Sequence, residues 1–389
     1  MIETKFKRTE VGIIPRDWNV VTIETIGEII TGTTPSTNIA DYYGEDYCFV
    51  SPFDLGCEKY INKTNKNLSL LGIDVCRKIP KGAILYTCTG STIGKIGIAN
   101  KLLATNQQIN SIVVNSNYSN EYVYYALQTR KENIRKLAAV QAVPLITKGI
   151  FAKTKFACPK TTQEQERIGI ALSDIDDLII SMRKLIEKKR NIKIGVMQNL
   201  LSGQKRLKGF TKKWTEIPLK EFKPKKGTQI NKNTLDADTL GYPVMNGGIA
   251  PSGYNSEYNS DANTITISEG GNSCGFVNLM KSRFWAGGHC YTLTVENDMS
   301  VGYIFQTLKF YESQIMALRT GSGLPNIKKT TLYEFKILIS LQKEEQEAIA
   351  KVFSDMDAEI EYLEFKLSKY ENIKQGMMQQ LLTGKIRLI

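Results

Sequence analysis

A stretch of this sequence occurs twice, 181 residues apart. The two copies begin at Gln165 and Gln346, and 19 of their 43 positions, down to Leu207, are identical without a gap. Weaker matches at the same offset continue upstream: Gly90 with Gly271, Gly94 with Gly275 and Pro144 with Pro325. A repeat of this period is a duplicated domain rather than a solenoid. The chain therefore alternates a variable domain, a conserved segment, a second variable domain and a second conserved segment.

Both conserved segments predict long helices. Apolar residues step by four and three along each: Ile168, Leu172, Ile175, Ile179, Met182 and Ile186 in the first, and Ile349, Phe353, Met356, Ile360, Leu363 and Leu367 in the second. Such heptad spacing is typical of helices that pair along one seam. No proline interrupts either segment, and Gly203 and Gly384 stand where a helix should end. We expect each helix to be about 60 Å long and the two seams to form a helix–helix interface, rather than each seam packing only on its own core.

The predicted fold class is α+β, with two repeated α/β domains separated by two long antiparallel coiled-coil helices in a pseudo-twofold arrangement. The expected boundaries are residues 1–158 and 206–340 for the domains, and 159–205 and 341–389 for the helices. The helices should be antiparallel because the short connections cannot carry the chain back along a helix of about 60 Å. Within the domains we expect strands at 83–87, 111–114, 155–158, 263–267 and 291–295, and helices at 121–137 and 301–318.

The charge of the chain points to a polyanionic partner. Its net charge is +12 and its pI is about 9.1, which fits nucleic acid or an anionic membrane surface. No apolar run reaches the roughly 18 residues that span a bilayer, and the first residues lack the apolar stretch of a signal peptide. We therefore expect a cytoplasmic protein that binds nucleic acid and no membrane. Seven cysteines without a C-x-x-C pair and one histidine, His289, argue against a metal site.

Motifs for catalysis are missing. The segment Gly90-Ser-Thr-Ile-Gly-Lys resembles a phosphate loop, but its glycines are too close and Ile96 stands where Ser or Thr should be. Ser51-Pro-Phe-Asp lacks the second proline of an amino-methyltransferase segment. The sequence thus predicts no catalytic residues, no metal ligands and no cofactor bound by this chain.

Six further segments act together as a signature: Trp18, Gly90-Ser-Thr-Ile-Gly-Lys-Ile-Gly, Asn106-Gln-Gln-Ile, Val143-Pro-Leu-Ile-Thr-Lys, Glu164-Gln-Glu-Arg-Ile and Leu200-Leu-Ser-Gly. In this combination and order the chain resembles the specificity subunits of type I restriction-modification enzymes. The resemblance implies two target-recognition domains, each reading one half of a split site on double-stranded DNA. It also implies two methylation subunits that dock on the helices and use S-adenosylmethionine, and restriction subunits that cleave with ATP and Mg. The helices would set the spacing of the half-sites.

The candidate DNA-binding residues lie in the glycine-rich turns and the amide-rich segments. They are Ser91, Thr92, Lys95, Asn106, Gln107 and Gln108 in the first domain, and Asn272, Ser273, Arg283 and His289 in the second. Amide and ammonium groups of this kind contact adenine and phosphates, but in a tight turn they also satisfy the loop backbone. The second domain departs from the pattern, since Gly287-Gly-His289 replaces Asn106-Gln-Gln and Phe276 replaces Lys95. The two half-sites should therefore differ in sequence.

Two other functions compete with this interpretation, a self-contained DNA methyltransferase and a structural coiled-coil scaffold. The missing cofactor motifs argue against the methyltransferase, and the large variable domains argue against the scaffold. The repeated segments Ser173-Asp-Ile-Asp and Ser354-Asp-Met-Asp place carboxylates on one helix face. That face is either solvated or a subunit contact.

Overall fold

The computed structural model describes residues 5–56, 58–138, 143–230, 241–321, 323 and 325–389. Its contacts group the chain into two units: residues 1–182 with 366–389 form unit 1, and residues 183–365 form unit 2. Each unit contains one globular domain, the beginning of one long helix and the end of the other. Among the described residues no helix is both long and apolar enough to cross a membrane.

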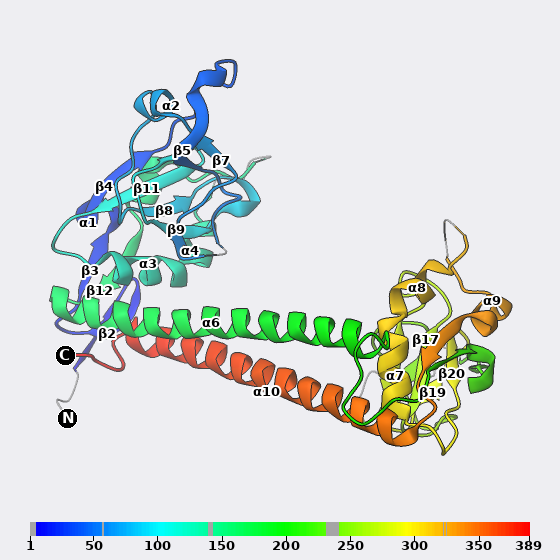
Figure 1. Cartoon of the computed structure of the whole chain (residues 1–389). Coiled ribbons are helices and arrows are strands. Elements are labelled where there is room, and N and C mark those ends of the chain that lie inside the picture. Colours follow the sequence, from blue (N-terminus) through cyan, green and yellow to red (C-terminus); the bar gives the residue numbers. More distant parts are fainter. Residues whose placement is uncertain (1–4, 57, 139–142, 231–240, 322, 324) are drawn as a thin grey trace. The chain divides into compact units, whose positions relative to one another are not determined.

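Unit 1 is built on a five-stranded sheet of order β4-β11-β8-β9-β6 (Figure 1). These strands are β4 (Gly27–Thr31), β11 (Ile109–Val114), β8 (Ile84–Thr87), β9 (Ile96–Ala99) and β6 (Tyr60–Ile61). A three-stranded sheet holds β10 (Ala104–Thr105), β5 (Tyr43–Val50) and β7 (Lys66–Leu68), and strand pairs join β1 (Phe6–Thr9) to β2 (Gly12–Pro15) and β3 (Asn19–Thr22) to β12 (Lys155–Cys158). The helices are α1 (Ile23–Ile26), η1 (Ala40–Tyr42), α2 (Leu70–Asp74), η2 (Gly90–Thr92), α3 (Asn120–Thr129), α4 (Lys131–Arg135) and α5 (Lys148–Ala152).

Unit 2 repeats this plan, with fewer strands among its described residues. Its four-stranded sheet has the order β14 (Lys225–Lys226), β20 (Cys290–Leu293), β17 (Thr264–Ser268) and β18 (Val277–Met280). A three-stranded sheet holds β16 (Tyr254–Asn255), β15 (Tyr242–Met245) and β19 (Trp285–Ala286), and β13 (Thr215–Pro218) pairs with β21 (Lys336–Ile339). The helices are η3 (Leu219–Phe222), α7 (Val301–Phe310), α8 (Glu312–Ala317) and α9 (Lys329–Glu334).

The pairing of strands confirms the duplication. The antiparallel trio β11-β8-β9 of unit 1 corresponds to β20-β17-β18 of unit 2, and the parallel pair β5-β10 corresponds to β15-β19. Serine caps the following helix in both copies, because the Ser119 and Ser300 side chains accept from the backbone N–H groups of Tyr122 and Tyr303. The predicted mixed α/β class with two repeated domains is therefore confirmed.

Each domain helix was expected to be continuous but is broken in the middle. The predicted helix 121–137 divides at Arg130 into α3 and α4, and the predicted helix 301–318 divides at Tyr311 into α7 and α8. Both residues have φ near −90° and ψ near 0°, a conformation that ends an α-helix without glycine or proline. The second helix then contributes a fully buried isoleucine to the core, Ile134 in unit 1 and Ile315 in unit 2.

The conserved segments form the two long helices α6 (Thr162–Leu200) and α10 (Lys343–Leu381), of 39 residues each. Gly203 and Gly384 follow their ends with φ of 72° and 68°, the left-handed conformation that stops a helix. The start of α6 shares the core of unit 1 with the end of α10, through Leu172 and Leu381. In unit 2 the end of α6, at Leu201, shares a core with the start of α10, at Phe353.

The predicted heptad positions are largely buried. All six positions of α6, from Ile168 to Ile186, are at most 9% exposed. In α10, Ile349, Phe353 and Ile360 are buried, whereas Met356, Leu363 and Leu367 are half-buried. The first two positions of each seam also pack on the neighbouring domain, so these residues belong to a domain core as well as to a helix face.

Candidate nucleic-acid interface

Two of the predicted segments of unit 1 lie at the same end of the five-stranded sheet. The turn Gly90–Lys95 joins β8 to β9, and Asn106–Gln108 leads directly into β11. Because Ile109 pairs with Thr87 at the end of β8, both segments leave the sheet there, and the Cys88 N–H donates to the Gln108 carbonyl at 2.9 Å. Gly90 and Gly94 have φ of 69° and 92°, which explains why this turn needs glycine at both positions.

The amide side chains of unit 1 are already engaged locally. Asn106 Nδ2 donates to Gln108 Oε1 at 3.1 Å, and the Gln108 N–H donates back to Asn106 Oδ1 at 3.1 Å. Gln107 is exposed and accepts from the Thr34 hydroxyl. These contacts satisfy the turn and leave amide groups at its surface, so DNA contact by these residues stays a prediction.

Lys95 and Thr92 also make contacts inside the domain. Lys95 Nζ donates to the Pro52 carbonyl at 3.0 Å, and the Thr92 hydroxyl donates to the Thr89 carbonyl at 2.9 Å. Ser91 is exposed. Lys95 therefore holds the loop that follows β5, which runs from Ser51 to Gly56 and is termed the β5 loop below.

In unit 2 the candidate residues divide between two places. Ser273 Oγ donates to the Gly247 carbonyl, and the His289 N–H donates to Asn246 Oδ1 at 3.2 Å. Asn272 and the His289 side chain are exposed, and His289 Nδ1 lies 3.5 Å from a Glu269 carboxylate oxygen. Arg283 instead contacts a different segment, with its guanidinium 4.7 Å from the centre of the Tyr258 ring and 3.7 Å from Asp261.

The two loops after β5 and β15 were not anticipated as part of the site. The β5 loop was considered only as an incomplete methyltransferase motif. Its counterpart runs from Asn246 to Ser252 after β15 and is termed the β15 loop. The Asn106 N–H donates to the Val50 carbonyl at 3.0 Å, and the Gly287 N–H, at the matching position, donates to Met245 at 2.8 Å. A cluster of Pro, Gly and Asp at a strand end was the available signal.

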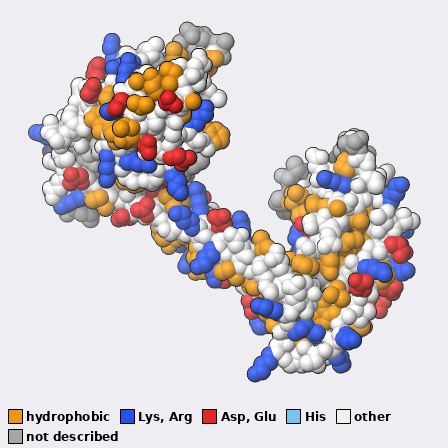
Figure 2. Space-filling view, turned by 45° about the horizontal axis from the view of Figure 1, so that its top comes forward, with side chains coloured by type: hydrophobic (Ala, Val, Ile, Leu, Met, Phe, Trp, Pro, Cys, Tyr) orange, Lys and Arg blue, Asp and Glu red, His pale blue; other side chains and the backbone are white. Residues whose placement is uncertain are grey.

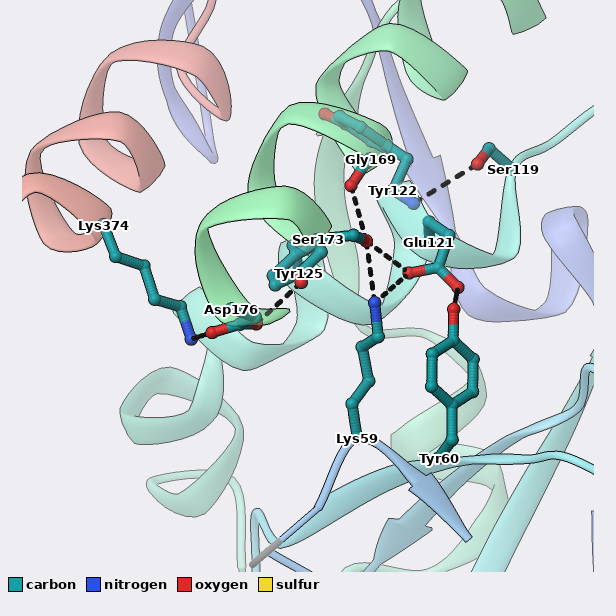
Figure 3. Close-up of polar contacts among 10 residues, drawn as sticks. All are labelled: Lys59, Tyr60, Ser119, Glu121, Tyr122, Tyr125, Gly169, Ser173, Asp176 and Lys374. Atoms are coloured by element: carbon teal, nitrogen blue, oxygen red, sulfur yellow. Dashed lines mark hydrogen bonds and ion pairs between the residues drawn. The ribbon is translucent and has the colours of Figure 1, made fainter. Parts of the chain in front are cut away.

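Side chains at matching positions of the repeat attach each domain to the long helices. Asp176 on α6 accepts from the Tyr125 hydroxyl at 2.7 Å and pairs with Lys374 at 2.6 Å (Figure 3). Exactly 181 residues on, Asp357 accepts from Gln306 at 3.1 Å and pairs with Lys193 at 2.6 Å. The last carboxylate of each Ser-Asp-x-Asp segment therefore makes contacts within its own unit. The two expected alternatives, a solvated face and a contact with another subunit, did not include this arrangement.

One further attachment is found only in unit 1 among the residues that the structure describes. Lys59, only 7% exposed, pairs with Glu121 at 2.8 Å and donates to Ser173 Oγ at 2.7 Å (Figure 3). The Tyr60 hydroxyl donates to the second Glu121 oxygen, and burial together with this bond raises the pKa of Tyr60. In unit 2, Gly302 stands at the position of Glu121, and a cavity of about 580 Å³ opens beside Gly302 and Ser354.

In each unit, an arginine that follows the glycine at the end of a long helix binds a glutamate near the start of the other long helix. Arg206 forms two hydrogen bonds with Glu345, at 2.6 and 2.7 Å, and its guanidinium lies 5.4 Å from the Trp214 ring centre. Arg387 repeats the arrangement with Glu164, at 2.5 and 2.8 Å, and lies 5.7 Å from the ring centre of Trp18. We term these arginine–glutamate–tryptophan clusters the clasps. Their geometry accounts for the recurrence of Trp, Glu and Arg in the sequence.

Two related domains that have the same turns but carry different side chains on them define a protein built from a duplicated domain. A family model described as "Type I restriction modification DNA specificity domain" matches residues 15–190 and again 211–372. The chain belongs to this family. The expected membership in the specificity subunits of type I restriction-modification systems is thereby confirmed at the level of the family.

Several named relatives agree with this assignment. The MjaIX specificity subunit of Methanocaldococcus jannaschii is 34% identical over 203 residues, which cover 51% of this chain and 46% of that protein. The match thus spans about half the length of that relative. The MjaVIII specificity subunit of the same organism is 24% identical over 432 residues and covers 99% of this chain and 97% of the relative.

A solved structure shows the same fold. The S subunit of the type I restriction-modification system from M. genitalium has a TM-score of 0.69 and 20% identity, over 97% of this chain and 98% of that one. A second structure, from work on complex assembly and conformational transition of the type I R-M system, has a TM-score of 0.60 and 15% identity over 96% and 99%. Within the described residues no group of three or more His, Cys, Asp or Glu side chains could hold a metal ion.

Proposed function

We propose that this chain gives a type I restriction-modification enzyme its DNA sequence specificity, with each unit reading one half of a split site. The observation that carries the proposal is that one loop architecture bears two different sets of side chains. The hydrogen bonds to Val50 and Met245 are the same in both units, but Asn106-Gln-Gln in unit 1 is Gly287-Gly-His in unit 2. Different donors and acceptors on one frame read different base edges in the major groove.

A domain exchange tests this proposal. Residues 1–158 are replaced by the corresponding domain of another specificity subunit, and the variant is expressed with its methylation subunits in a host whose methylome is sequenced. We expect one half of the methylated site to change and the other half to stay the same. A change in both halves at once would show that the units do not read independently.

We further propose that α6 and α10 form an antiparallel coiled coil on which two methylation subunits dock. Figure 2 shows Lys and Arg side chains along the helices, together with acidic and hydrophobic ones. Exposed apolar residues support a docking role: Leu178 and Ile373 in unit 1, and Leu185, Ile192 and Phe365 in unit 2. The methylation subunits would supply S-adenosylmethionine, and restriction subunits would supply ATP and Mg, so this chain needs no cofactor of its own.

The helices are also proposed to set the distance between the half-sites. Four residues inserted after Arg190 would lengthen α6 by about 6 Å and would shift its seam as a stutter. We expect a methylated site whose gap is longer by about one or two base pairs, at about 3.4 Å each, with unchanged half-sites and reduced activity. Methylation mapping on a library of spacer lengths measures the gap, and an active variant with the original gap would refute the role of the helices as a spacer.

The alternative function is that of an enzyme, a self-contained DNA methyltransferase. The purified chain is incubated alone with duplex DNA and labelled S-adenosylmethionine. We expect no transfer until the methylation subunits are added. Transfer by the chain alone would overturn the proposed division of labour.

A further inference from the structure

Each unit exposes a large apolar side chain on the loop beside its predicted DNA-binding turns. Phe53 lies three residues after β5 and is 78% exposed, more than any other large hydrophobic side chain in the described part of the chain. Ile249 lies four residues after β15 and is 64% exposed. Single exposed apolar residues are common on proteins, so what requires an explanation is their recurrence in corresponding loops of a duplicated fold, at positions that differ by one residue.

The β5 loop is held in one conformation. Asp54 Oδ2 accepts from the N–H and the hydroxyl of Ser51, at 2.9 and 2.7 Å. Asp54 Oδ1 accepts from the N–H and the amide of Asn65, both at 2.9 Å. Lys95 anchors Pro52, the residue before Phe53. Because hydrogen bonds fix the loop on both sides of Phe53, the folded conformation of the loop exposes this ring, and local disorder does not explain its exposure.

The β15 loop is fixed by equivalent contacts. The Gly247 carbonyl accepts from the hydroxyls of Ser268 and Ser273, both at 2.5 Å. Gly247 is the second residue after β15, as Pro52 is the second after β5, and in each unit the glycine-rich turn supplies a side chain to that carbonyl. Two units that share little else in these loops therefore both anchor the loop and then present an apolar residue.

The groups around Phe53 and Ile249 indicate what kind of partner these side chains contact. Lys95 contacts the β5 loop, Asn106 bonds to the residue just before it, and the chain carries a net charge of +12. A partner must therefore offer an apolar surface flanked by negative charge and hydrogen-bonding edges, and the base stack of a DNA duplex has all three. Proteins that open or kink a duplex insert Phe or Ile side chains between neighbouring base pairs.

We propose that Phe53 and Ile249 are wedge residues, each inserting its side chain between two adjacent base pairs at the half-site that its own unit reads. This inference rests on the proposed function, since it assumes that each unit binds DNA. It adds a residue that acts through base stacking rather than through base-edge hydrogen bonds, and it makes the ease of unstacking at one step part of the recognised sequence.

The test uses the assembled complex of this chain with its methylation subunits. 2-Aminopurine replaces each purine of the recognised site in turn, except a methylated one, and its fluorescence rises when stacking is lost. The variants are Phe53→Ser, Ile249→Ser and the apolar replacement Phe53→Leu. Ile13→Ser is the matched control, because Ile13 is 65% exposed but lies in the β1–β2 hairpin and not in the turns and loops proposed to bind DNA.

We expect one probe position per half-site to brighten with the unchanged protein. Phe53→Ser should abolish that signal in one half-site only and weaken specific binding about ten-fold, and Ile249→Ser should do the same in the other half-site. Phe53→Leu and Ile13→Ser should keep both signals. A Phe53→Ser complex with the full signal and unchanged affinity would overturn the proposal.

Two other outcomes distinguish a failure of the wedge proposal from a failure of the proposed DNA-binding function. If Phe53→Ser prevents assembly with the methylation subunits, Phe53 is a protein contact and the wedge is refuted. If the unchanged complex binds specific and random duplexes equally, the proposed function itself fails, whatever the fluorescence shows.

Discussion

Arg206 and Arg387 show how much of each unit depends on one side chain. Glu345 has no exposed side-chain surface, and Arg206 satisfies both of its oxygens. Burial alone would raise the pKa of Glu345, but the hydrogen bonds from Arg206, Ser340 and Trp214 outweigh it and hold the pKa below the ordinary 4.5. At Asp17, which also binds Arg387, the hydrogen bond to that arginine is the main cause of a lowered pKa.

The substitution Arg206→Met should destabilise unit 2 by about 3 kcal/mol at pH 7, because it strands a buried carboxylate. A lowered folded-state pKa contributes stability above the ordinary value of 4.5 and loses it as the pH falls through the folded value. In the variant the carboxyl protonates instead, so its deficit relative to the unchanged protein should shrink as the pH falls from 7 to below 4.5. Hydrogen exchange within residues 183–365 measures the free energy.

The control for the clasp is Lys220→Met, which removes an exposed pair with Glu334 at 3.8 Å. Its effect should stay within about 0.5 kcal/mol at every pH. A deficit of Arg206→Met that is equally large at pH 4 and pH 7 would contradict the buried-carboxylate explanation.

At the scale of elements, the contact of Lys59 with α3 and α6, next to the two-residue strand β6, distinguishes the two units. Lys59, which precedes it, lies buried between Glu121 of α3 and Ser173 of α6. Unit 2 has Gly302 at the position of Glu121, and a cavity lies beside it. The globular domain of unit 1 should therefore be bound more firmly to the start of α6 than the domain of unit 2 is to the start of α10.

The substitution Lys59→Ala should cost unit 1 about 2 kcal/mol, since it leaves Glu121 and Ser173 without their shared partner in a site of restricted solvent access. Amide exchange should accelerate at residues 58–61 and at the start of α3. Lys78→Ala, which removes an exposed pair with Asp74, should change stability by less than about 0.5 kcal/mol. Equal effects of the two substitutions would show that the Lys59 contact is no more than a surface pair.

The sequence predicted regular elements well and their contacts poorly. Heptad spacing and Gly203 and Gly384 located α6 and α10, because both signals are local. The breaks at Arg130 and Tyr311 escaped prediction, since no glycine or proline marks them. The glycine turns were found as candidates, but the bond from Lys95 to Pro52 joins residues 43 apart in the chain. Lys59 gave no local signal at all, because its partners lie 62 and 114 residues away.

At the scale of the whole molecule, the repeat makes the two long helices interchangeable in principle. Arg206 and Arg387 occupy matching positions, as do Leu201 and Leu382, and each group completes the core or clasp of one unit. A chain of residues 1–208 should therefore dimerise, with α6 of one copy taking the place of α10 in the other. Light scattering measures its mass.

Arg206→Glu in that shortened chain is the control, because it places like charge against Glu164 of the other copy, and it should shift the dimer toward monomer. A shortened chain that is monomeric at micromolar concentration would show that α10 has become indispensable through its own sequence changes.

The division of unit 1 also fixes the order in which the protein is completed on the ribosome. Residues 1–182 emerge first, yet their unit is closed only by residues 366–389, which bring Leu381, Leu382 and Arg387 to Trp18 and Leu172. At about 5–20 residues per second, the intervening synthesis takes about 10–40 s. Throughout that interval the oldest part of the nascent chain presents an uncovered apolar surface, and at its end the later-made unit 2 has all its residues while unit 1 does not. A ribosome that stalls after residue 365 would thus release a product whose second half is finished and whose first half still lacks its closing segment.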